Sequence, residues 1–146
     1  MASSTNFFSA AQQELIKQAI MQAEENTSGE IRVRVEDKCA EDPVDNAMKA
    51  FEALKMHETE LRNGVLFYLA VADKKFAIVG DGGINEVVPA NFWDHIKDHM
   101  LLRFKEGKFT EGLCEGLQKA GEQLKKHFPR KSNDVNELQD DISFGD

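Results

Sequence analysis

Asp81 directly follows a predicted strand, Lys75–Gly80, and two glycines come after it. Arg62 and Asn63 stand just before another predicted strand, Val65–Ala72. Because only two residues separate these strands, we expect them to pair as an antiparallel hairpin, which would bring Asp81 beside Arg62 and Asn63. Carboxylate and amide oxygens are the ligands that hard cations prefer. The spacing therefore predicts a site for Ca²⁺ or Mg²⁺ at this end of the sheet.

Two further segments are expected at the same end. Glu30 opens an alternating strand, Glu30–Glu36, which we expect to lie parallel to Val65–Ala72 through a helical crossover. A polar loop carrying several acidic side chains precedes Arg62. The predicted metal ligands are Asp81, Asn63, Glu30, Glu58 and Glu60. The alternative is ordinary turn chemistry, since Asp-Gly-Gly is a common way to leave a strand.

The same residues are compatible with phosphate chemistry. Phosphoryl transfer needs positive charge on the transferred group and an activated nucleophile. Arg62 can clamp a phosphate, His57 can act as a general acid or base, and Asp81 can hold a metal. The alternative for Arg62 is a surface ion pair.

Several familiar sites are excluded. The segment Gly80–Gly83 lacks the spacing of a dinucleotide-binding loop. His95 and His99 lie four residues apart without the remaining residues of a zinc protease motif, which favours a solvated pair. Cys39 and Cys114 form no paired motif, so we expect free thiols.

Composition narrows the partners. The formal net charge is −8, which argues against nucleic-acid binding because that depends on Lys and Arg neutralising phosphates. No apolar run has the length of a membrane span, and the first residues lack the pattern of a secretory signal. We therefore expect a cytoplasmic protein without membrane insertion, and a monomer.

The elements that must position these residues follow from periodicity. Apolar residues recur at helical spacing in four segments, 9–25, 42–55, 91–105 and 109–127. Residues 84–89 read as a connector. The continuously apolar run Val65–Ala72 is predicted to be a central strand. The polar face of Glu30–Glu36 instead indicates a position near a sheet edge. The order predicts an α/β fold, a three-layer α/β/α sandwich with a small mixed β-sheet.

These elements define the expected domain and its core. Residues 1–8 are predicted to be a tail, 9–128 the domain, and 129–146 an acidic, largely flexible tail. A short docked segment at Ile142–Phe144 is the alternative for part of that tail. The expected core includes Phe67, Leu69, Ile78 and Trp93.

Two stretches, Arg62–Val71 and Phe76–Ile84, resemble the TPM domain family, and Ser28–Val33 agrees with its first strand. The resemblance extends over residues 7–128. It implies an α/β/α sandwich, divalent-cation binding and the acid phosphatase activity reported for plant members. The family often has Asp-Asn-Gly where this chain has Arg62, Asn63 and Gly64, so an arginine replaces a carboxylate here.

Three functions remain open from the sequence. The first is an accessory or regulatory module that binds a divalent cation. The second is a metal-assisted acid phosphatase acting on phosphomonoesters. The third is a protein-interaction domain that uses its acidic tail and needs no metal.

Overall fold

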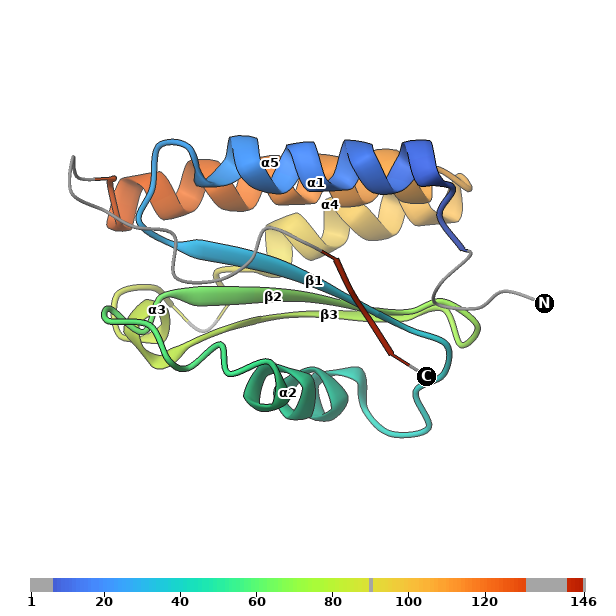
Figure 1. The fold of residues 1–146 in the computed structure, drawn as a ribbon, viewed down its shortest axis with the longest axis horizontal. Coiled ribbons are helices and arrows are strands. Elements are labelled where there is room, and N and C mark those ends of the chain that lie inside the picture. Colours follow the sequence, from blue (N-terminus) through green and yellow to red (C-terminus); the bar gives the residue numbers. More distant parts are fainter. Residues whose placement is uncertain (1–6, 90, 131–141, 146) are drawn as a thin grey trace.

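The computed structural model describes residues 7–89, 91–130 and 142–145 as a mixed sheet between two layers of helices (Figure 1). Helices α1, α4 and α5 cover one face of the sheet, and α2 covers the other, which confirms the predicted three-layer fold. The elements are α1 (Ala10–Glu24), β1 (Glu30–Glu36), α2 (Pro43–Ala53), β2 (Gly64–Ala70), β3 (Lys75–Gly80), α3 (Gly82–Asn85), α4 (Asp94–Lys105), α5 (Phe109–His127) and β4 (Ile142–Phe144).

Local hydrogen bonds explain where two of the helices begin. Ser9 Oγ accepts the backbone N–H of Gln12 at 3.1 Å, while Gln12 Oε1 accepts that of Ser9 at 2.8 Å. This is the reciprocal pair of a capping box. At α2, Asp42 accepts the N–H of Val44 at 2.8 Å and Pro43 takes the first helical position. Both starts were predicted from the sequence.

The strand order is β3-β2-β1-β4. Strands β1 and β2 are parallel, with Glu30 opposite Gly64, and β2 and β3 are antiparallel, with Val65 opposite Gly80. Every residue of β2 is buried, which confirms its prediction as a central strand covered on both faces.

The predicted position of β1 near a sheet edge is confirmed, because β1 lies next to the edge strand β4. Strand β4 pairs with β1 in parallel, with Val33 opposite Ile142, so β1 lies inside the sheet. Arg34 on the polar face of β1 donates to Ser143 Oγ at 2.8 Å, so this side chain binds a neighbouring strand rather than open solvent. Residues 142–144 thus adopt the docked alternative, and 131–141 lie outside the described residues.

Boundaries differ from the prediction at several places. Strand β2 ends at Ala70 rather than Ala72. The backbone N–H groups of Val71 and Ala72 both donate to carbonyls at the end of β1, those of Glu36 and Asp37, and not to β3. A single-turn helix, α3, begins in the segment predicted as a break and a connector. Helix α4 begins at Asp94, three residues later than predicted.

The core lies on both faces of the sheet. The larger cluster fills the space between the sheet and helices α1, α4 and α5, and it contains the predicted core residues Phe67, Leu69, Ile78 and Trp93. A smaller cluster lies under α2. Cys39 and Cys114 are free thiols, as predicted. None of the helices in the described ranges combines the length and apolar character needed to cross a bilayer.

Candidate functional site

The sheet topology brings the central candidate residues to one end of the molecule. The backbone N–H of Asp81, directly after β3, donates to Gly64 O at 2.9 Å. The N–H of Glu30, at the start of β1, donates to Asn63 O at 3.3 Å. Asp81, Asn63 and Glu30 therefore meet where β1 and β2 begin and β3 ends, as the predicted pairing requires.

The strongest contact at this end is a bidentate ion pair between Arg62 and Asp81. Arg62 Nε lies 2.7 Å from Asp81 Oδ2, and Nη2 lies 2.8 Å from Oδ1. The N–H of Gly82 also donates to Oδ1 at 2.7 Å. The Asp81 side chain is only 5% exposed and that of Arg62 is 55% exposed. The carboxylate raises the pKa of Arg62 through these hydrogen bonds and its charge, and Arg62 adopts the ion-pair alternative.

The backbone around the pair is tightly constrained. Arg62 has a positive φ of 51°, and its carbonyl accepts the N–H of Gly83 at 2.8 Å. A Cβ on Gly83 would lie 2.0 Å from Leu61 O and 2.6 Å from Arg62 O. Only glycine permits so close an approach of two backbone segments. The backbone carbonyls of Leu61 and Arg62, just before β2, therefore lie directly against the turn that contains Asp81.

Other oxygen-bearing side chains are buried at or near this end of the sheet. Asn63 is 1% exposed, and its Nδ2 lies 3.4 Å from Ser28 Oγ. Glu30 is 3% exposed. Thr59, in the loop that leads to Arg62, has a buried hydroxyl without a hydrogen-bond partner in the described part of the chain.

The sequence analysis did not identify Glu24, at the end of α1, as part of the candidate site. Glu24 is buried, and its Oε2 accepts the N–H of Ile31 at 2.7 Å. A signal was present, because Glu24 continues the four-residue spacing of the buried Ile16 and Ile20. The helix thus ends with a carboxylate that holds the start of β1.

The three loop residues of the prediction behave differently. His57, Glu58 and Glu60 are all exposed. The side chains of His57 and Glu58 make no hydrogen bond or ion pair within residues 7–89, 91–130 and 142–145. Over the same ranges, no three His, Cys, Asp or Glu side chains are grouped so that they could hold a metal ion. The buried part of the candidate site is therefore Asp81, Asn63 and Glu30.

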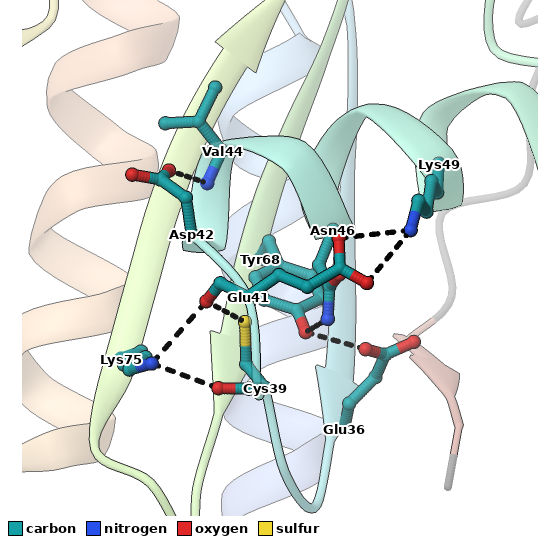
Figure 2. A network of polar contacts seen from close by, with 9 residues as sticks. All are labelled: Glu36, Cys39, Glu41, Asp42, Val44, Asn46, Lys49, Tyr68 and Lys75. Carbon is teal, nitrogen blue, oxygen red and sulfur yellow. Dashed lines mark hydrogen bonds and ion pairs between the residues drawn. The ribbon is translucent and has the colours of Figure 1, made fainter.

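A second polar network lies at the opposite end of β1, beneath α2 (Figure 2). The Tyr68 hydroxyl donates to Glu36 Oε1 at 2.5 Å and accepts from Asn46 Nδ2 at 3.3 Å. Burial and the hydrogen bond to Glu36 raise the pKa of Tyr68. In the sequence analysis, Tyr68 is only one residue of the apolar run Val65–Ala72. A buried phenol needs a hydrogen-bond partner, so a tyrosine within an apolar run is the signal that could have revealed this network.

Close to this network, hydrogen bonds join the loop after β1 to the β2–β3 hairpin. The N–H of Cys39 donates to Asp73 Oδ2 at 2.7 Å. Lys75 Nζ donates to the carbonyls of Cys39 and Glu41 at 2.9 and 3.3 Å (Figure 2). Cys39 Sγ lies 3.1 Å from Glu41 O. These contacts fix the loop and give Cys39 a structural environment.

The histidine pair of α4 is also accounted for. His99 Nε2 binds Glu115 Oε1, which also accepts from Arg103 Nε at 3.1 Å. Both partners lower the pKa of Glu115, with the hydrogen bond to His99 the larger cause. His95 is exposed.

Solved structures similar to this chain include proteins from three bacteria. The BA42 protein of the psychrophile Bizionia argentinensis, solved by NMR, is 48% identical and superposes with a TM-score of 0.91 over 99% of this chain and 100% of its own. An N-terminal domain from P. gingivalis shares 21% identity at a TM-score of 0.69, covering 84% of this chain and 80% of its own. The N-terminal domain of the cg2496 protein of Corynebacterium glutamicum shares 14% at 0.67, covering 92% and 84%. These last two show the fold alone.

A search of curated proteins found no match. The family model described as the TPM domain matches residues 1–123, which is most of the chain. This match agrees with the resemblance carried by the strands around Asn63 and Asp81. The chain therefore belongs to the TPM domain family.

Proposed function

We propose that this domain is an accessory or regulatory module that binds a divalent cation, Ca²⁺ or Mg²⁺, around Asp81. The observation that carries the proposal is the burial of oxygen-bearing side chains from three segments, Asp81, Asn63 and Glu30, at one end of the sheet. Hard cations take such carboxylate and amide oxygens together with backbone carbonyls.

The guanidinium of Arg62 acts as the resident counter-ion of the site. It occupies both oxygens of Asp81, so a cation must displace it to reach the carboxylate. Displacement is sterically simple, because the Arg62 side chain is 55% exposed and can turn into solvent. Repulsion between a cation and a nearby guanidinium weakens binding, so we expect modest affinity that rises when the arginine charge is removed.

The backbone adds to the proposed ligand set. Gly83 keeps the carbonyls of Leu61 and Arg62 close to the turn at Asp81. The Thr59 hydroxyl is a further neutral oxygen in the preceding loop. A site with few carboxylates and several neutral oxygens suits weak to moderate cation affinity.

The test is a titration of the isotope-labelled protein with CaCl₂ and with MgCl₂, followed by amide NMR shifts. Arg62→Asp should tighten binding by roughly tenfold, because it exchanges a repelling charge for a ligand. Aspartate also tolerates the positive φ of this position. Asp81→Asn should weaken binding. Arg103→Asp is the matched control, since Arg103 pairs with Glu115 and Glu106 between α4 and α5.

Shifts centred on residues 62–64 and 80–83 support the proposal. Shifts centred on Asp37, Asp42 and Asp45, or equal effects of Arg62→Asp and Arg103→Asp, would contradict it. Turnover of para-nitrophenyl phosphate on the same samples tests the phosphatase hypothesis. That hypothesis assigns roles to Arg62 and His57. Loss of turnover when either of these two residues is replaced singly would be its signature.

A further inference from the structure

A second candidate site lies at the other end of the sheet. A cavity of about 290 Å³ opens where the β2–β3 hairpin meets the end of α4 and the start of α5. Leu69 and Val71, the last apolar residues around the end of β2, contribute to its base. Ligands of open α/β sheets bind at the carboxyl ends of the parallel strands. This cavity lies at that end of β2, whereas Asp81 lies at the opposite end.

Phenylalanines from four segments form much of the wall. Phe76 of β3 meets Phe104 of α4 edge-on with ring centroids 5.2 Å apart, and Phe104 stacks on Phe109 of α5 at 5.5 Å. Phe7, before α1, meets Phe109 edge-on at 5.3 Å. These rings are only half-buried although they pack against the core. The contacts hold the rings in place, so the apolar surface is already formed and needs no rearrangement to receive a ligand.

The charged residues of the lining are all positive. Lys74, Lys75 and Lys105 line the cavity, and no Asp or Glu among residues 7–89, 91–130 and 142–145 does so. This local excess stands out in a chain with 26 acidic and 18 basic residues. Lys75 is committed to two backbone carbonyls, whereas Lys74 and Lys105 are exposed and form no ion pair with any residue in the described ranges. Two ammonium groups are therefore available beside an aromatic cavity.

We infer that this cavity binds a small anionic amphiphile, namely the carboxylate of a medium-chain fatty acid. The apolar tail enters between the phenylalanines, and the carboxylate stays at the rim with Lys74 and Lys105. The volume suits one short tail and is too small for a helix or a folded partner. The proposal is independent of cation binding at Asp81, because the two sites use different residues at opposite ends of β2.

The first experiment titrates the labelled protein with decanoate below its micellar concentration. Saturable amide shifts should concentrate on residues 69–76 and 101–109. Decyltrimethylammonium has the same tail and the opposite charge, and it should bind about tenfold more weakly or worse. A separate cavity is lined by residues of α1 and α5, among them Leu15 and Cys114. Equal binding of the two amphiphiles, or shifts centred on that separate cavity, would overturn the inference.

Paired variants separate the tail pocket from the charged rim. Leu101, which lines the cavity, is 42% exposed, and its neighbour Leu102, which does not, is 58% exposed. Leu101→Trp should fill the mouth and abolish decanoate binding, while Leu102→Trp should leave it unchanged. Both positions are at the surface, so both variants should fold.

The rim is tested by removing its charge. The double variant Lys74→Asn with Lys105→Gln should weaken decanoate binding by about tenfold and leave 1-decanol binding unchanged, because the alcohol has no charge to lose. Lys125→Asn with Lys126→Gln, in the last turn of α5, is the matched control. If both double variants weaken decanoate equally, net charge rather than this rim governs binding and the inference fails.

Discussion

Tyr68 in β2 donates a 2.5 Å hydrogen bond to Glu36 at the end of β1, so a fully buried phenol joins two parallel strands from beneath α2. Asn46 of α2 donates to the same hydroxyl. The Glu36 carboxylate also accepts hydrogen bonds from Nε and Nη2 of Arg34. Nη1 of the same arginine donates to Ser143 Oγ in β4. One chain of hydrogen bonds thus connects α2 with three of the four strands.

Replacing this phenol should destabilise the domain. Tyr68→Phe leaves the Glu36 oxygen and the Asn46 amide without their shared partner, which should lower the free energy of unfolding by about 1–3 kcal/mol. Urea denaturation measures the change, and the slope of the transition should stay constant because the fold is retained. An unchanged midpoint would mean that water replaces the phenol without cost.

The ionisation of Tyr68 can be followed directly, since it is the one tyrosine of the chain. Burial and Glu36 raise its pKa in the folded protein. Tyrosinate absorbance should therefore stay low in the native protein as the pH passes about 10, and it should appear near pH 10 when urea unfolds the chain. Ionisation of the native protein at the ordinary pH would contradict the buried hydrogen bond.

The same shift predicts how stability depends on pH. The folded pKa lies above the unfolded value, so folding favours the protonated phenol. This contribution is fully present below about pH 10 and is lost as the pH rises above it. Unfolding free energy should thus fall more steeply above pH 10 in the native sequence than in Tyr68→Phe, which lacks the group.

The glycines after Asp81 should differ sharply in their tolerance of a methyl group. At Gly83 a Cβ would meet Leu61 O at 2.0 Å, whereas at Gly82 it would meet nothing within 4 Å. We expect Gly83→Ala to cost about 3 kcal/mol, as overpacking against rigid backbone does. Gly82→Ala should change stability by less than about 1 kcal/mol. Thermal or urea unfolding of both variants gives the comparison, and equal effects would contradict the close approach.

The central strand should carry a large share of the packing energy. Leu69 is buried in the main core cluster, so Leu69→Ala should lower the free energy of unfolding by about 2–5 kcal/mol. Leu102→Ala, on the exposed side of α4, is the control and should change it by less than about 0.5 kcal/mol. Similar values for the two variants would show that β2 is less well packed than its burial indicates.

Most of the fold was predictable because its signals are local. The apolar run of β2, the alternation of β1 and the caps at Ser9 and Asp42 each specify an element from neighbouring residues alone. Strand β4 was only an alternative, because three residues carry no periodicity and their pairing with β1 is set by distant contacts.

The candidate site was also predictable only in part. Antiparallel pairing predicts from the sequence alone that Asp81 lies beside Arg62 and Asn63. The sequence left both an ion pair and a phosphate-binding role open for Arg62, since that choice depends on where a flexible side chain turns. Glu24 escaped notice because an acidic residue at a helix end ordinarily faces solvent.

The docking of β4 on β1 also bears on how the chain matures. β4 is the last of the four strands to leave the ribosome, so a nascent chain that has already paired β1 with β2 still presents one open edge of β1. Open edges invite pairing with other polypeptides. The charged side chains that alternate along β1, among them Arg34 and Glu36, discourage such pairing until residues 142–144 arrive. The same polar face therefore protects the unfinished sheet and later binds the strand that completes it.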